Sequence, residues 1–76
     1  MEDGVGIGRA VRARLIELDM RPVDLAHEAH LSESYVTMLL NGKITDPKLS
    51  KAAEVAEALD MSLRELWERS RDVPAE

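Results

Sequence analysis

The chain has 76 residues, of which 45% are hydrophobic and 33% charged, and its formal net charge is −5. A chain of this length has room for one domain with one small core, and this composition is typical of a compact fold rather than of a disordered tail. The absence of cysteine excludes disulfides and thiolate metal sites, and no apolar run approaches the roughly 18 residues of a membrane span.

The N-terminal segment is acidic and glycine-rich, unlike a secretory signal, so we expect a cytoplasmic protein. Glycine costs backbone entropy in a helix, so we expect residues 1–6 to be flexible and a first helix to run from about Ile7 to Leu18. Spacing then predicts one apolar face on this helix, made of Val11, Leu15 and Leu18.

A second helix is predicted to begin at Pro22, because proline has no N–H to leave unpaired in a first turn. The helical spacing of apolar residues that follows Pro22 ends near His30, so this helix should stop there. Its predicted buried stripe consists of Leu25, Ala26 and Ala29.

Ser32 is a good N-cap for a third helix, and Glu33 then lies favourably at the positive end of the helix dipole. Asn41-Gly42 ends this helix, because glycine readily adopts the left-handed conformation that follows a helix. The positions expected to be buried are Val36, Leu39 and Leu40.

Two more helices are predicted in the second half of the chain. Asp46-Pro47 opens a fourth helix, whose apolar positions 49, 52, 53, 56 and 59 fit a period of 3.6 residues. Ser62 and Glu65 have the spacing of a capping box, which indicates a fifth helix. The apolar residues of that helix are Leu63, Leu66 and Trp67.

No stretch of the sequence alternates between apolar and polar residues, so we expect no sheet. The tail over residues 71–76 contains Pro74 and is expected to fray. The sequence therefore predicts an all-α domain of five helices over residues 7–70.

Residues 22–41 combine the features of a helix-turn-helix. Small Ala26 lets the second and third helices cross closely, and a three-residue connection, His30-Leu31-Ser32, turns the chain between them. Val36 and Leu39 would hold the third helix against the second. The opposite face fits a DNA major groove about 12 Å wide, and it carries Glu33, Ser34, Thr37 and Met38, with Tyr35 and Asn41 at its edge.

From about Ile7 to Trp67, the chain resembles the Cro/cI-type (XRE-like) repressor family. The resemblance rests on an ordered set of residues: Leu25-Ala26, Leu31-Ser32, Ser34-Tyr35-Val36, Leu39, Asn41-Gly42-Lys43, Pro47, and the run from Ala56 to Leu66. It implies a compact five-helix, lambda-repressor-like fold whose third helix reads bases, and a homodimer that binds palindromic double-stranded DNA.

The chain departs from this family at several positions, including Leu15 and Arg14 of the first helix, which are shifted by one. Pro22 stands where glutamine is common, Arg21 replaces the usual N-cap hydroxyl, and Glu33 replaces a basic or amide side chain. His30 stands where the turn usually has glycine, so its backbone is strained or the turn differs.

Carried over position by position, the resemblance implies two kinds of DNA contact. The residues that face base edges would be Glu33, Ser34, Thr37 and Met38, with Glu33 accepting from a cytosine amino group and Met38 touching a thymine methyl. The residues that hold phosphates would be Arg21, Tyr35, Asn41, Lys43 and Lys48.

Simpler interpretations of three of these residues stay open. Tyr35 could be a half-buried residue at the edge of the core, since tyrosine often bridges core and water. Met38 could fill an apolar gap, and Glu33 could serve only the helix dipole.

The acidic net charge does not favour DNA binding, but its distribution does not exclude it. Residues 1–51 carry seven basic and eight acidic groups, whereas residues 52–76 carry three basic and seven acidic groups. Most of the excess negative charge would therefore face away from DNA if the middle of the chain docks.

His27 and His30, with Asp24 and Glu28, have helical spacing and raise a zinc hypothesis, but surface histidines are the preferred interpretation because a third well-placed ligand is needed. The sequence indicates no metal and no other cofactor. No pairing of a nucleophile with a base supports catalysis, so the chain is not expected to be an enzyme.

The leading hypothesis is a sequence-specific transcriptional repressor, dimeric through the fifth helix at Leu63, Leu66 and Trp67. The alternative is a protein-interaction module on the same fold, antitoxin-like or an adaptor, with weak or no DNA binding. A third interpretation is that the chain is the N-terminal part of a longer regulator.

Overall fold

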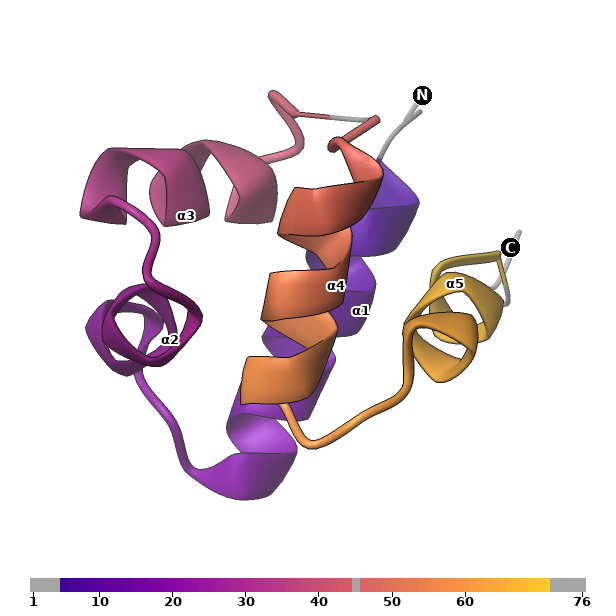
Figure 1. Ribbon diagram of the computed structural model, residues 1–76, viewed down its shortest axis with the longest axis horizontal. Helices are drawn as coiled ribbons and strands as arrows, with labels where there is room; N and C mark the ends of the chain where they lie inside the picture. Colours follow the sequence, from indigo (N-terminus) through magenta and orange to yellow (C-terminus); the bar gives the residue numbers. More distant parts are fainter. Residues whose placement is uncertain (1–4, 45, 72–76) are drawn as a thin grey trace.

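The computed structural model describes residues 5–44 and 46–71, which contain five helices and no strand. The helices are α1 Val5–Leu18, α2 Pro22–Ala29, α3 Glu33–Leu40, α4 Leu49–Ala58 and α5 Leu63–Arg71. Figure 1 shows α2 and α3 on one side of the central pair α1 and α4, and α5 on the other side. The predicted all-α fold is confirmed. Residues 1–4 and 72–76, which belong to the ends expected to be flexible, lie outside the described residues.

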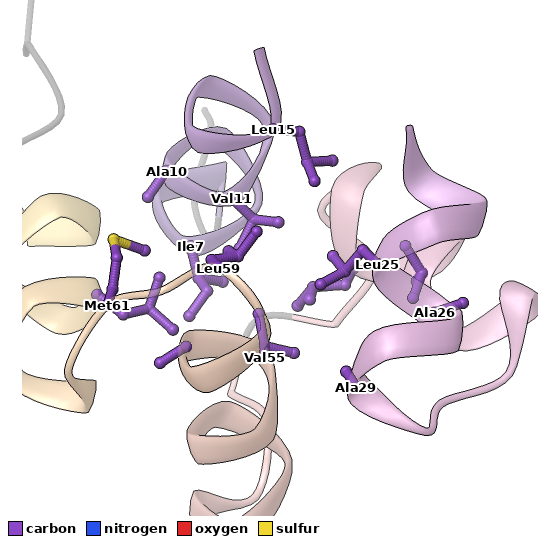
Figure 2. Close-up of a cluster of buried hydrophobic side chains, with 14 residues drawn as sticks. Ile7, Ala10, Val11, Leu15, Leu25, Ala26, Ala29, Val55, Leu59 and Met61 are labelled. Atoms are coloured by element: carbon purple, nitrogen blue, oxygen red, sulfur yellow. The ribbon is translucent and has the colours of Figure 1, made fainter. Parts of the chain in front are cut away.

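All five helices contribute to one hydrophobic core. Side chains of α1, α2 and α4 converge at its centre (Figure 2), and α3 and α5 close it from two sides. The largest fully buried side chains are Val11, Leu25, Val36, Leu39, Val55, Leu59 and Leu66. None of the described helices is long and apolar enough to cross a membrane.

Four of the helices end in a left-handed residue. Asp19, His30 and Asp60 have φ angles of 55°, 59° and 60° after α1, α2 and α4, and Gly42 has a φ of 78° after α3. After α3, for example, the Lys43 N–H donates to the Met38 carbonyl, which satisfies a carbonyl that the helix leaves unpaired. The same bond pattern follows the other three helices, so each one stops abruptly and the connections stay short.

The first helix starts at Val5 rather than near Ile7, so Gly6 and Gly8 are helical. The glycine at position 8 has a packing reason. A Cβ at this position would lie 2.5 Å from the Leu39 carbonyl oxygen and 3.2 Å from that of Leu40. Glycine therefore lets α1 approach the C-terminal end of α3 more closely than any other residue would permit.

The predicted buried stripe of α4 was partly wrong. Ala52, Ala56 and Leu59 are buried as expected, but Leu49 is 66% exposed and Ala53 is also exposed. Val55, which was not predicted, is 2% exposed and takes their place in the core. Both stripes fit a helical period, so the sequence did not distinguish them. Leu18 was predicted to belong to the apolar face of the first helix, but it is 37% exposed at the end of α1.

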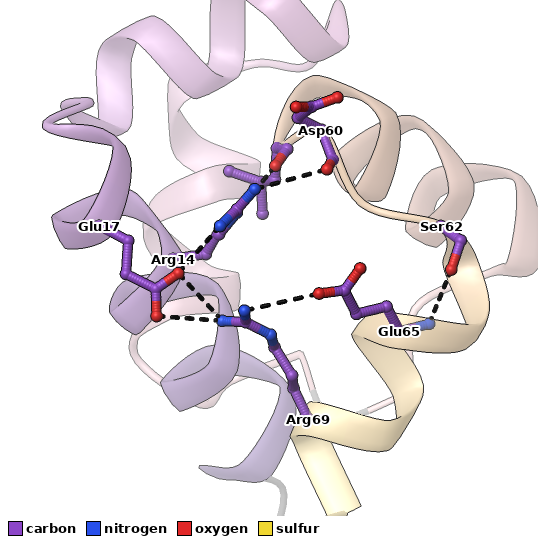
Figure 3. A network of polar contacts seen from close by, with 7 residues as sticks. Arg14, Glu17, Asp60, Ser62, Glu65 and Arg69 are labelled. Carbon is purple, nitrogen blue, oxygen red and sulfur yellow. Dashed lines mark hydrogen bonds and ion pairs between the residues drawn. The ribbon is translucent and has the colours of Figure 1, made fainter.

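Ion pairs join α1 to α5 on the side away from α3 (Figure 3). The Arg14 Nε donates to the Leu59 carbonyl at 3.0 Å, and its Nη1 donates to Glu17 at 2.9 Å. Arg69 of α5 pairs with both Glu17 and Glu65. The hydrogen bond from Arg14, together with Arg69, lowers the pKa of the Glu17 carboxyl below its usual value. Arg14 thus connects α1 to the end of α4, and Glu17 connects it to α5.

We expect Gly8→Ala to destabilise the protein by about 1–2 kcal/mol. Alanine gains up to about 1 kcal/mol of helix propensity, but its Cβ would meet a backbone carbonyl that cannot rotate away, and overpacking of this kind costs about 1–3 kcal/mol. Chemical denaturation of the two proteins measures the difference. An increase in the free energy of unfolding, as propensity alone predicts, would show that α1 and α3 are not in close contact here.

Candidate nucleic-acid interface

The second helix begins at Pro22 and is held at its start by Asp24. The Asp24 carboxylate accepts from the Arg21 backbone N–H at 3.0 Å and from the Arg21 Nε at 3.2 Å. These bonds, above all those from the Arg21 side chain, lower the pKa of Asp24. The ionised Asp24 carboxylate therefore stabilises the folded protein at any pH above the pKa that aspartate has in the unfolded chain. This contribution is lost as the pH falls through the lower pKa that Asp24 has in the folded protein.

The turn between α2 and α3 is built around a strained histidine. His30 has φ 59° and ψ 42°, in the left-handed region, so the strained alternative predicted from the sequence is the correct one. The Leu31 N–H donates to the Ala26 carbonyl at 2.8 Å and closes the turn. The Ser32 Oγ then accepts from the Tyr35 N–H at 3.0 Å, which confirms Ser32 as the N-cap of α3.

The third helix is anchored by one face and exposed on the other. Val36 and Leu39 are each 1% exposed and pack into the core, which also contains Leu25 and Ala26 of α2. Leu40 is half-buried against the same core. The four side chains predicted to face bases are all exposed: Glu33, Ser34, Thr37 and Met38. Figure 1 shows α3 at the edge of the molecule, in agreement with the exposure of these side chains.

The residues predicted to hold phosphates lie at several places around α3. Asn41 and Lys43 are exposed just after its C-terminal end, and Lys48 is exposed where α4 begins. Tyr35 is half-buried on α3 itself. The Arg21 side chain is 77% exposed but paired with Asp24, so part of its charge is already neutralised.

Two further cations near α3 were not among the predicted site residues. The Arg12 Nη2 donates to the Leu40 carbonyl at 3.2 Å, which places a guanidinium at the C-terminal end of α3. The Lys51 Nζ lies 6.0 Å from the centroid of the Tyr35 ring. Both contacts join residues that are far apart in the sequence, so no local motif could have indicated them. The only available signal was that Lys51 follows Lys48 by about one helical turn.

An acidic hollow lies beside the turn. It has a volume of about 300 Å³ and is lined by carboxylates of α2 and α4, at Glu28, Glu54 and Glu57, together with His30. This side of the helix-turn-helix is therefore negative, unlike the C-terminal end of α3, where Arg12 and Lys43 lie. Within residues 5–44 and 46–71, no three His, Asp or Glu side chains come together in a way that could hold a metal ion.

The fifth helix only partly fits the predicted dimer surface. Leu66 is 0% exposed and packs in the monomer core, so it is not available to a second subunit. Leu63 and Trp67 are half-buried and retain some exposed surface. The prediction was wrong for Leu66 because the apolar side of α5 is used to cover α1 and α4.

Residues 11–66 match the model of a helix-turn-helix family, HTH_3. The match covers α2, the turn and α3, as well as α4 and most of α1. Neither the search of curated proteins nor the search of solved structures gave a match.

We expect His30→Gly to stabilise the protein by about 0.5–1 kcal/mol. A left-handed backbone costs a non-glycine residue about 1–2 kcal/mol, and glycine avoids this cost. Because glycine also has more conformational freedom in the unfolded chain, folding costs it more backbone entropy, and this cancels part of the gain. Thermal or chemical denaturation measures the change. His30→Ala is the control: it removes the imidazole but keeps the strain, so it should not stabilise. If both variants destabilise equally, the imidazole itself contributes and strain is not the main effect.

Proposed function

We propose that this chain, which belongs to the Cro/cI-type helix-turn-helix family, is a sequence-specific transcriptional repressor that reads DNA with α3. Family membership already supports a DNA-binding regulator. The observation that carries the finer proposal is the two-sided character of α3. Val36 and Leu39 are buried, while the opposite face is exposed along the whole helix.

The exposed face of α3 has the size and chemistry for a major groove. An α-helix fits a groove about 12 Å wide, and base edges there offer donors, acceptors and thymine methyl groups. Glu33 would accept from a cytosine amino group, Ser34 and Thr37 would donate or accept, and Met38, which is 41% exposed, would contact a thymine methyl.

Phosphate contacts would position α3 in the groove. Asn41 and Lys43 lie at its C-terminal end, where Arg12 also places a positive charge. Lys48 lies at the start of α4. Phosphate contacts of this kind carry little sequence information but fix the register of the protein on the duplex.

Palindromic recognition by a homodimer is part of this proposal. Two copies would place their reading helices in successive major grooves, about 34 Å apart on one side of the duplex. The domain measures 33 × 24 × 21 Å, so two copies fit beside each other over that spacing. Of the residues predicted for the dimer contact, Leu63 and Trp67 are the ones with exposed surface.

Selection from a pool of randomised duplexes tests the proposal. Purified protein should enrich a palindromic sequence with half-sites about one helical turn apart, and its affinity for that sequence should fall steeply as salt is raised. Failure to enrich any sequence, with no binding to DNA at about 50 mM salt, would contradict the proposal. Co-purification of a protein partner together with that failure would instead favour a protein-interaction module.

Lys43→Ala and Thr37→Ala should affect DNA binding in different ways. Loss of Lys43 should weaken binding to all sequences alike and lower the salt slope by about one unit, because a phosphate contact is lost. Loss of the Thr37 side chain should change the preference at one base pair by roughly 1–3 kcal/mol and leave the slope unchanged. Binding curves on the selected duplex and its single-base variants separate the two effects. Identical behaviour of the two variants would contradict this division of roles.

A further inference from the structure

Tyr35 of α3 and Lys51 of α4 come together beside the reading face. The Lys51 Nζ lies 6.0 Å from the centroid of the Tyr35 ring, at the outer limit of a cation–π contact. Both side chains are half-buried, so each keeps part of its surface exposed to solvent. The two residues belong to different helices, so it is the fold that brings them together.

The polar ends of this pair are available to a ligand. Within the described part of the chain, the Tyr35 hydroxyl makes no hydrogen bond and the Lys51 ammonium makes no ion pair. Burial raises the pKa of Tyr35 above its usual value, so its hydroxyl keeps the proton that it can donate. A neutral hydroxyl and an ammonium both donate hydrogen bonds, and an anion with several acceptor oxygens is the ligand that suits them.

The pair also lies where the DNA backbone would pass. Tyr35 precedes Met38 by three residues, so the two side chains are neighbours on the surface of α3. Met38 belongs to the face proposed to read bases, and phosphates line both edges of the groove that such a face enters. Lys51 follows Lys48, already proposed as a phosphate contact, by about one turn of α4. Lys48 and Lys51 therefore place two positive charges about one turn apart at the start of α4, and the contact with Tyr35 brings the second of them to α3.

We propose that Tyr35 and Lys51 together bind one phosphate of the DNA backbone. The Tyr35 hydroxyl and the Lys51 ammonium each donate to it, and the ring holds the ammonium in position. This inference rests on the proposed DNA binding, and it assigns a contact to Lys51 that sequence patterns did not indicate. It also gives Tyr35 a partner, so that the two residues act as one site.

Salt-dependent affinity for the duplex recovered by selection tests this site. Lys51→Gln should weaken binding about tenfold, and it should make the salt slope less steep by about 0.9. Tyr35→Phe should weaken binding by about threefold to tenfold with the slope unchanged, because only a hydrogen bond is lost. Lys51→Arg keeps the charge and should keep the slope. Circular dichroism and thermal denaturation verify that each variant is folded.

Arg64→Gln is the matched control, because it removes one positive charge from an exposed position on α5, on the other side of the molecule (Figure 1). Since α5 also carries the proposed dimer contact, size-exclusion chromatography verifies that this variant keeps the oligomeric state of the original protein. The variant should leave both the affinity and the slope almost unchanged. An equal effect of Arg64→Gln and Lys51→Gln would show that only net charge matters, and it would overturn the shared site.

The double variant decides whether the two residues share a phosphate. If they do, Lys51→Gln should cost clearly less affinity in the Tyr35→Phe background than in the original protein. Strictly additive losses would overturn the proposal. If the original protein selects and binds a duplex but Lys51→Gln binds it normally, this inference fails while the proposed function stands. If the original protein binds no duplex, both fail.

Discussion

The third helix, proposed to read DNA, depends on its contact with the rest of the domain. A helix of eight residues is too short to persist alone in water, so α3 exists because Val36 and Leu39 bury against the core. These two residues also fix its rotation about its own axis, and this rotation decides which side chains point outward. The same packing therefore provides both the stability of α3 and the direction of Glu33, Ser34, Thr37 and Met38.

The C-terminal end of α3 is held by α1 in two ways. Gly8 brings the α1 backbone close to the carbonyls of Leu39 and Leu40, and one helical turn later Arg12 donates to the Leu40 carbonyl. The first contact needs the absence of a side chain, whereas the second needs a long one. Glycine near a helix start, which at first suggests a flexible segment, here permits the close approach that positions the candidate interface.

The features that sequence reasoning predicted well are local ones. Proline at the start of α2 and the Ser32 cap each depend on residues within one or two turns, so the sequence itself indicated them. For His30 it left two alternatives open, a strained backbone or a different turn, and the structure has the first. The features that it missed depend on contacts between distant segments. Arg12 and Leu40 are 28 positions apart, and Lys51 reaches Tyr35 from another helix. The stripe of α4 was partly wrong for a related reason, because alternative stripes fit the period and only the neighbouring helices select one. For the candidate site, the sequence therefore indicated which face of α3 is exposed but not all the charges that surround it.

The side of the domain opposite α3 is held together by ion pairs among Arg14, Glu17, Glu65 and Arg69. They fasten α5 to α1 on the side opposite α3, and the last residue of α5 is Arg71. A fluorophore or a fused protein joined beyond α5 would thus extend away from the duplex in the proposed complex. Such a label could report the rotational slowing that accompanies association without occupying the groove, and sensors or chimeric regulators could be assembled from that end.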